Sequence, residues 1–466
     1  MLFSSIPFLF YFLPCVLIAY YLVPKPVKTK VLLLASLLFY GWGEPLYVFL
    51  MLGTIFIVYL LGLGIEKYRD RMGQKVCFWI AVSVSLGLLA FFKYADFFIV
   101  NVNRFAGTRV PLLKIALPIG ISFYTFQVLS YIIDVYRGKV AVQKNFVTLA
   151  TYITMFPQLI AGPIVRYADV ERQLTDREIH FSKIAYGIRR FVLGLGKKVL
   201  IANVLGEFCV HFRLSEEKTL VLFWAYAIAV SLQIYFDFSG YSDMAIGLGS
   251  MLGFHFMENF NYPFISKSIT EFWRRWHMSL GTWFRDYVYI PLGGSRCSLL
   301  RNLFNIFVVW MFTGFWHGAE WNFVIWGLYF GILLIIEKLF LLKHLEKHQF
   351  IGHVYVLFVT IISFMIFDAE NLSLVFAHIK AMFDVGGTPL SSVETMYYLE
   401  SYGLILLVAV IGATPLPKLL VEKLKANNSI RRLLLAFEPV FMVLLLLVVT
   451  AYLVDGSFNP FLYFRF

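Results

Sequence analysis

The feature that most constrains the fold of this chain is a series of long apolar runs that continues along almost its whole length. About 20 consecutive apolar residues allow a helix to cross a lipid bilayer. The sequence therefore predicts an all-α integral membrane protein with roughly eleven to thirteen membrane helices. The candidate spans lie near residues 5–23, 31–43 with 45–65, 76–92, 116–136, 146–163, 184–205, 219–236, 302–316, 322–342, 351–367, 402–420 and 433–454.

Composition supports the same fold class. Hydrophobic residues make up 60% of the chain and charged residues 15%, whereas about 25% of the residues in a soluble domain are charged. Residues 237–301 are less apolar and rich in Trp, Arg, Asp and Gly. Such a stretch is tolerated at membrane depth only where it is buried in protein or lines a wet cavity. We expect one polytopic domain, residues 1–466, with helices around a partly polar hollow.

The net charge of +12 arises largely from short basic clusters. These are Lys25/Lys28/Lys30, Lys67/Arg69/Arg71/Lys75, Arg189/Arg190/Lys197/Lys198 and Lys418/Lys423/Lys425/Arg431/Arg432. Basic connections between apolar segments are typical of cytoplasmic loops. The sequence contains no soluble basic stretch interleaved with aromatic residues, so we expect no nucleic-acid function.

Several common chemistries have no motif in this sequence. The cysteines Cys15, Cys77, Cys209 and Cys297 are scattered without a CxxC pair, which indicates neither a zinc site nor a disulfide framework. There is no G-x-S-x-G elbow, Walker loop or H-E-x-x-H motif. We expect no bound metal.

His317 is the most informative single residue because it stands inside the apolar stretch 308–326. An ionisable side chain at the bilayer centre costs about 2.5–3.5 kcal/mol or more, and histidine exchanges a proton near neutral pH. Gly314 and Gly318 flank it, and Trp316 and Trp321 are candidates for the walls of a site. The functional interpretation is a general base acting on a hydroxyl. The alternative is an interhelical hydrogen bond or an interfacial position.

A second candidate region covers residues 270–287. If it is helical, Trp273 and His277 lie one turn apart and Trp276 belongs to an apolar surface. Arg274, Arg275 and Arg285 supply positive charge. One interpretation is an interfacial helix whose arginines meet lipid phosphates. The other is a helix beside the cavity, with His277 assisting His317.

Two further segments place polar groups near apolar runs. Asp237 and Asp243 lie in residues 235–243, and we expect them to pair with arginines from residues 274–296 in a structural network. Gly293, Gly294, Ser295 and Arg296 can offer N–H groups and a guanidinium to a phosphate, but a Gly-Gly pair first of all predicts a turn.

With these residues in view, the chain resembles the membrane-bound O-acyltransferase (MBOAT) family, and within it the alginate O-acetyltransferase (AlgI-like) branch. Five stretches carry the resemblance, in order along nearly the whole chain: residues 156–164, 236–243, 271–294, 314–318 and 459–464. The resemblance implies a funnel surrounded by about eleven membrane helices. It also implies that residues 237–322 form the catalytic core, with His317 as the catalytic residue and His277 as the second polar position.

The resemblance further implies acyl transfer across a bacterial cytoplasmic membrane. The expected donor is cytoplasmic acetyl-CoA, with Arg274, Arg275 and Arg296 as candidates to hold its phosphates, and no cofactor is permanently bound. The acceptor is an exported or cell-wall polysaccharide. An outer-face SGNH-type partner protein is expected to deliver the acetyl group.

Two alternatives remain open at this stage. Within the family, the chain would transfer D-alanine from a carrier protein to teichoic acid. From another class, it would be a proton-coupled transporter or flippase, although the inverted repeats common in transporters are absent from the sequence.

Overall fold

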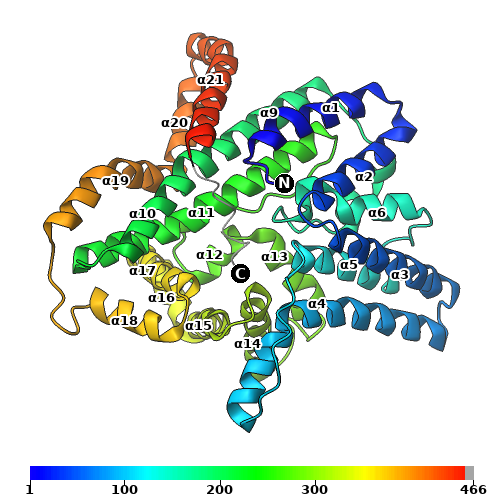
Figure 1. Ribbon diagram of the computed structural model, residues 1–466, viewed down its shortest axis with the longest axis horizontal. Coiled ribbons are helices and arrows are strands. Elements are labelled where there is room, and N and C mark those ends of the chain that lie inside the picture. The colour runs from blue at the N-terminus through cyan, green and yellow to red at the C-terminus, as the bar shows by residue number, and fades with distance from the viewer. Residues whose placement is uncertain (457–466) are drawn as a thin grey trace. The chain divides into compact units, whose positions relative to one another are not determined.

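A computed structural model describes residues 1–456 of the chain (Figure 1). Helices make up 77% of the chain, and the described part contains no strand. A helix satisfies its own backbone N–H and C=O groups, which is what a hydrocarbon environment requires of a spanning segment. The predicted all-α membrane fold is confirmed. The stretch 459–464 lies outside the described residues.

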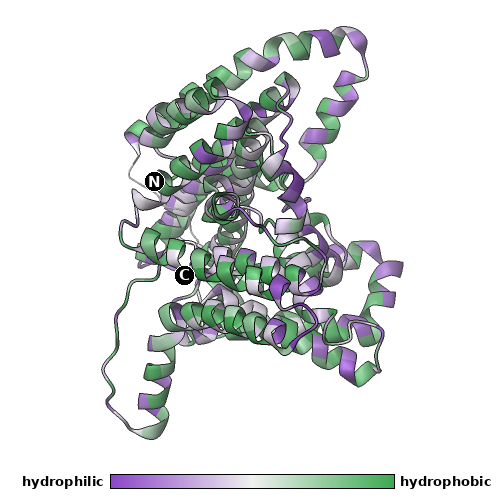
Figure 2. Cartoon of the chain, turned by 90° about the vertical axis from the view of Figure 1, so that its right-hand side faces the viewer, coloured by the Kyte–Doolittle hydropathy of each residue, from purple (hydrophilic) through white to green (hydrophobic). Residues whose placement is uncertain are grey.

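Within residues 1–456, eight helices are long and apolar enough to cross a membrane. They are α3 (Tyr47–Lys67), α4 (Met72–Ala106), α11 (Leu220–Met251), α14 (Leu299–His317), the continuous helix Trp321–Lys347, α17 (Gln349–Asp368), α19 (Val393–Gly412) and α21 (Asn428–Asp455). Hydrophobic residues run along these helices (Figure 2). The chain is therefore a multi-pass membrane protein.

Shorter elements connect and flank these spans. They are η1 (Phe8–Phe12), α1 (Leu13–Leu22), α2 (Lys25–Gly41), α5 (Ile121–Tyr136), α6 (Phe146–Thr154), α7 (Phe156–Leu159), α8 (Tyr167–Thr175), α9 (Phe181–Gly196), η2 (Lys197–Ala202), α10 (Asn203–Leu214), η3 (Pro263–Ile265), α12 (Ile269–Arg275), α13 (Met278–Phe284), η4 (Arg285–Tyr289), α15 (Trp321–Ile336), η5 (Glu337–Leu341), α16 (Leu342–Lys347), α18 (Leu372–Met382) and α20 (Leu416–Lys425). The predicted span 146–163 is split into the short helices α6 and α7. This is one reason why fewer long spans occur than the apolar runs suggest.

Contacts divide the chain into two compact units. Unit 1 comprises residues 1–191 and 242–257, and unit 2 comprises residues 192–241 and 258–466. Helices α9 and α11 each contribute residues to both units.

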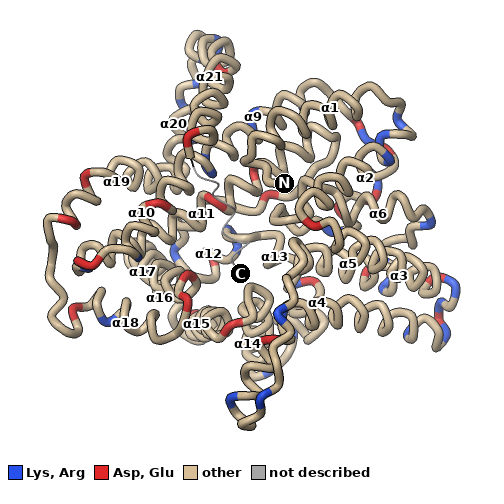
Figure 3. The backbone as a smooth tube through the Cα atoms, in the orientation of Figure 1, with Lys and Arg blue, Asp and Glu red and all other residues tan. Residues whose placement is uncertain are grey.

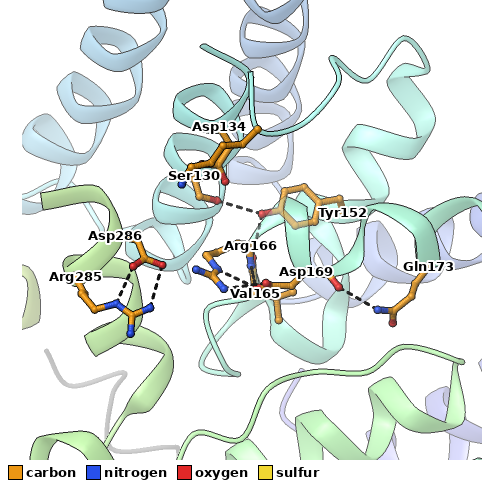
Figure 4. Close-up of polar contacts among 10 residues, drawn as sticks. Ser130, Asp134, Tyr152, Val165, Arg166, Asp169, Gln173, Arg285 and Asp286 are labelled. Atoms are coloured by element: carbon orange, nitrogen blue, oxygen red, sulfur yellow. Dashed lines mark hydrogen bonds and ion pairs between the residues drawn. The ribbon is translucent and has the colours of Figure 1, made fainter. Parts of the chain in front are cut away.

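In unit 1, the buried side chain of Tyr152 contacts the segment that leads into α8 (Figure 4). The Tyr152 hydroxyl donates to the Val165 carbonyl at 3.0 Å and lies 3.5 Å from the Ser130 hydroxyl. Arg166 then starts α8 by pairing with Asp169 at 2.9 Å. The charge of Arg166 is thus paired within the first turn of α8.

The basic clusters differ in their positions. Residues 67–71 lie where α3 ends and α4 begins, and Figure 3 colours several backbone positions there as Lys or Arg. In contrast, residues 189–198 lie inside the continuous helical stretch of α9 and η2. The prediction that this cluster forms a loop is wrong, because carboxylates from α11 compensate its charges.

Those carboxylates are Asp237 and Asp243. The sequence analysis assigns both to a less apolar region, but α11 continues to Met251 and buries them. In unit 2, Asp237 forms an ion pair with Lys198. In unit 1, Asp243 lies 2.7 Å from the guanidinium of Arg190. These two basic partners, Lys198 and Arg190, come from the helical stretch of α9 and η2, whereas we expected arginines from residues 274–296.

In unit 2, α14 and α15 approach each other very closely. A Cβ added to Gly314 would lie 2.4 Å from the Phe323 carbonyl oxygen, and one added to Gly327 would lie 2.4 Å from the Trp310 carbonyl oxygen. Small residues permit this backbone contact, as at other membrane helix interfaces. The close pair sets the position of the last turn of α14, which ends at His317.

Candidate active site

The site in unit 2 begins with a break between two short helices. Helix α12 ends at Arg275 and α13 starts at Met278, so the predicted single helix through this region is wrong. His277 stands at the break with φ 43° and ψ 52°, in the left-handed region. Such a conformation costs on the order of 1–3 kcal/mol in a non-glycine residue and is concentrated at functional sites.

The break is held by an extended segment that precedes α12. The Met278 N–H donates to the Asn259 carbonyl at 3.0 Å, and the Asn261 N–H donates to the Arg275 carbonyl at 2.9 Å. These backbone bonds fix the path of the chain on both sides of His277.

One ring nitrogen of His277 has two polar neighbours, and the other nitrogen has none within residues 1–456. Nδ1 lies 3.2 Å from Asn259 Oδ1 and 3.5 Å from the Ser279 hydroxyl, whereas Nε2 has no hydrogen-bond partner among the residues described. The ring is buried, and Phe238 contacts it edge to face with the centroids 4.7 Å apart. Burial lowers the pKa of His277 to about 3, so the imidazole is neutral at pH 7.

A cavity of about 600 Å³ lies against His277. Its lining combines aromatic and polar side chains, a composition typical of ligand pockets. The lining residues are Thr270, Trp273, Arg274, His277, Met278, Leu280, Gly281, Thr282, Phe284, Arg285, Tyr289, Val309, Trp310, Thr313 and Leu334. The buried indole N–H of Trp273 has no hydrogen-bond partner within residues 1–456. The pocket wall therefore offers the Nε2 of His277, which has no partner among the described residues, and the N–H donor of Trp273.

Positive charge stands at the exposed part of the pocket lining. Arg274 and Arg285 are both exposed. Arg285 also lies 2.8 Å from Asp286, an interaction drawn in Figure 4. An anionic group that entered the pocket would meet two guanidinium groups.

A buried carboxylate anchors the helix that carries this wall. Glu337, in η5, accepts hydrogen bonds from the Ile269 N–H, the Thr270 N–H and the Thr270 hydroxyl. A carboxylate at a helix N-terminus satisfies backbone donors that have no partner within the helix. Glu337 thereby fixes the start of α12 and the position of Trp273.

His317 occupies a more enclosed position. It is 5% exposed, at the last turn of α14. Trp326 and Phe367 contact the imidazole edge to face, with centroid distances of 5.0 and 5.4 Å. The residues that line the 600 Å³ cavity include His277 but not His317. Instead, the neighbouring indole of Trp316 lies 6.1 Å from the His277 ring.

The other residues predicted for the site take different positions. Trp276 is buried and stacks on Phe272, and Arg275 pairs with Glu271 at 2.9 Å. Trp321 is 48% exposed, and Arg296 is exposed beyond the Gly293–Gly294 turn. Of the three predicted arginines, only Arg274 lines the cavity.

The turn predicted from the Gly293–Gly294 pair is confirmed. Gly293 and Gly294 have φ values of +113° and +57°, which favour glycine. The side-chain amides of Asn302 and Asn305 donate to the Gly294 carbonyl at 2.7 and 3.3 Å. The carbonyl is therefore used to hold the loop against α14.

Asn259, Glu337 and Trp310 belong to the site but were not among the predicted residues, whereas Arg285 was predicted as a source of positive charge. Glu337 could have been recognised from the sequence, because it is a carboxylate within a strongly apolar run. Asn259 could not, because it lies 18 residues before His277 in the sequence and the two meet only in the folded chain. No group of three or more His, Cys, Asp or Glu side chains that could hold a metal occurs in the described part of the chain.

Comparison with known proteins adds a family assignment to this geometry. The model of the MBOAT, membrane-bound O-acyltransferase family, matches residues 139–377. That region includes Asn259, His277, His317 and the whole lining of the cavity.

Individual relatives cover most of the chain. A probable alginate O-acetylase of Pseudomonas putida is 38% identical, over 100% of both chains. A peptidoglycan O-acetyltransferase of Helicobacter pylori is 32% identical over 84% of this chain and 81% of its own. A teichoic acid D-alanyltransferase of Bacillus subtilis is 30% identical over 62% of this chain and 75% of its own.

Proposed function

The chain belongs to the membrane-bound O-acyltransferase family, and on this premise we propose that it moves an acetyl group across the membrane to O-acetylate an exported or cell-wall polysaccharide. The similarity to an alginate O-acetylase along the entire length of both chains carries the proposal. The similarity to a teichoic acid D-alanyltransferase covers less of this chain. Because the family is one of acyltransferases, the transport alternative is set aside.

The proposed donor is acetyl-CoA on the cytoplasmic side of a bacterial cytoplasmic membrane. A thioester is already activated, so the protein needs no permanently bound cofactor. Arg274 and Arg285 at the cavity are suited to the phosphates of CoA, because a guanidinium forms charge-assisted hydrogen bonds with phosphate oxygens. Arg275 and Arg296 from the sequence prediction do not line the cavity, so we assign them no contact with the donor.

In the proposed reaction, an acceptor oxygen attacks the thioester carbonyl. His317 takes the proton from the attacking hydroxyl, the C–S bond breaks, and the thiolate leaves and receives a proton. Positioned general bases contribute about 10²–10⁴-fold to such reactions. His277 accepts a hydrogen bond that orients the hydroxyl. The Trp273 N–H, a buried donor in the cavity wall, is suited to the developing oxyanion.

The proposed partners lie outside the membrane domain. The attacking hydroxyl belongs to an SGNH-type protein at the outer face, which passes the acetyl group to the polysaccharide. The lipid bilayer surrounds the spanning helices.

The direct test measures O-acetylation of the cell's polysaccharide in strains that carry His317→Ala or His277→Ala, alongside transfer of radiolabelled acetyl from acetyl-CoA by purified protein in nanodiscs. We expect His317→Ala to reduce acetylation by at least about 100-fold with unchanged expression and thermal stability. His348→Gln, an exposed histidine, is the matched control and should retain wild-type activity. Full acetylation by a folded His317→Ala protein would reject the mechanism.

D-alanyl transfer is the second candidate, because one relative carries that name. Feeding cells with labelled D-alanine or labelled acetate separates the two functions. Label from D-alanine in the wall polymer that depends on this protein would favour the second candidate.

A further inference from the structure

A buried amide next to His277 determines which ring nitrogen carries the hydrogen, a point that the reaction scheme above leaves open. Asn259 is 1% exposed, and its Oδ1 lies close to three donors or possible donors. These are the Ser279 N–H at 3.2 Å, the Ser279 hydroxyl at 2.9 Å and His277 Nδ1 at 3.2 Å.

The backbone N–H of Ser279 determines the orientation of the amide. A peptide N–H can only donate, so the Asn259 atom that it meets must be the carbonyl oxygen. A carbonyl oxygen cannot donate, so the His277 nitrogen 3.2 Å from it must carry the hydrogen. The Ser279 hydroxyl is 3.5 Å from the same nitrogen, but it gives its one hydrogen to Asn259 Oδ1 at 2.9 Å and is left to accept. The neutral imidazole then has its hydrogen on Nδ1 and a lone pair on Nε2.

We infer that Asn259 is a positioning residue that holds His277 in the Nδ1–H form, so that the Nε2 lone pair is left to accept a hydrogen bond from the group that enters the cavity. Ser279 supports Asn259 by orienting its amide. The left-handed backbone at His277 contributes as well, since it turns the side chain toward Asn259 while Met278 N–H bonds to the Asn259 carbonyl.

Two observations support the assignment of Nε2. His277 lines the cavity, and its Nε2 is a buried atom without a partner within the described residues. A buried polar atom without a partner is rare and costly in a native protein. At this position the cost is removed when a hydroxyl or a water donates to Nε2.

The functional part of this inference rests on the proposed acyl transfer, but the tautomer does not. Protein labelled with ¹⁵N-histidine, reconstituted in lipid, reports the tautomer by solid-state NMR independently of any activity. The signal of His277, one of nine histidines, is assigned by its loss in His277→Phe. We expect Nδ1 to be protonated and Nε2 to be bare at pH 7 in the wild type, and a mixture of both tautomers in Asn259→Ala.

A second experiment compares the rates of acetyl transfer of Asn259→Ala and Asn259→Asp. The Asp side chain keeps the size and the acceptor oxygen, so it should restore most of the transfer rate that Asn259→Ala loses, which we expect to be at least tenfold. Asn305→Ala removes another buried amide of unit 2 that has no contact with His277, and it should lower stability without altering the tautomer or the rate beyond about twofold.

The possible outcomes separate the two proposals. An Nε2–H tautomer or an imidazolium in the wild type would overturn the inference. So would an Asn259→Ala protein with the wild-type rate, or an Asn259→Asp protein that is folded yet as slow as Asn259→Ala. Failure of the proposed donor or acceptor leaves the NMR result valid, since the tautomer is measured without substrate.

Discussion

The ring of His277 lies 6.1 Å from the indole of Trp316, with an angle of 57° between their planes. Trp316 directly precedes His317, and its indole lies 5.0 Å from that imidazole. One buried aromatic side chain therefore contacts both histidines that the sequence singles out. Any movement of Trp316 changes the surroundings of both.

Shortening Trp316 should reduce acyl transfer. Trp316→Leu removes a ring that lies near both imidazoles, and small misplacement of reacting groups reduces rates by on the order of 100-fold. Trp316→Phe keeps an aromatic ring and should retain more activity. Initial rates of acetyl transfer test this, and equal rates for Trp316→Leu and the wild type would contradict it.

Adding a methyl group to Gly314 should destabilise the protein. The new Cβ would lie 2.4 Å from the Phe323 carbonyl oxygen and 3.0 Å from Gly327 Cα, so α14 and α15 must separate. Such overpacking costs about 1–3 kcal/mol. The matched control is Gly403→Ala, where no atom lies within 4 Å of the new Cβ. Thermal unfolding in detergent should show a lower Tm for the first variant only.

Replacing the carboxylate of Glu337 should loosen the start of α12. In Glu337→Gln, an NH₂ group replaces one of the oxygens that accept from Ile269 and Thr270. Hydrogen bonds to a charged group contribute about 1.5–3 kcal/mol each, so both the Tm and the transfer rate should fall. Glu346→Gln, at an exposed position, serves as the control. A fall in Tm without any change in rate would show that α12 does not depend on this anchor for its function.

Replacing only one partner of the buried ion pair between Lys198 and Asp237 should destabilise the protein. Their side chains are 5% and 1% exposed, and an uncompensated buried charge costs about 3–5 kcal/mol. Lys198→Met and Asp237→Leu should each lower the free energy of unfolding by that amount, and the double variant by less than the sum. The exposed pair of Lys144 and Glu66 should contribute less than about 1 kcal/mol. Additive losses at Lys198 and Asp237 would contradict the coupling.

Much of the fold was predictable because the apolar runs are long and the bilayer permits few backbone solutions. The end of α11 could not be predicted, because Asp237 and Asp243 interrupt the apolar pattern while the helix continues to Met251. Their charges are compensated by Lys198 and Arg190 from a distant helical stretch. A local pattern contains no information about such partners.

At the site, sequence alone identified His317 and His277 as candidates, because a polar side chain in an apolar stretch needs a reason to be there. It also determined the all-α membrane fold and, through the order of its motifs, the resemblance to the family. The tertiary structure decided the rest. It broke the expected helix at His277, placed Asn259 against Nδ1 and brought the ring of Trp316 close to both histidines. Those relationships arise where segments far apart in the chain meet, and hydrogen-bond direction and ring packing at such contacts depend on three-dimensional positions that residue order does not contain.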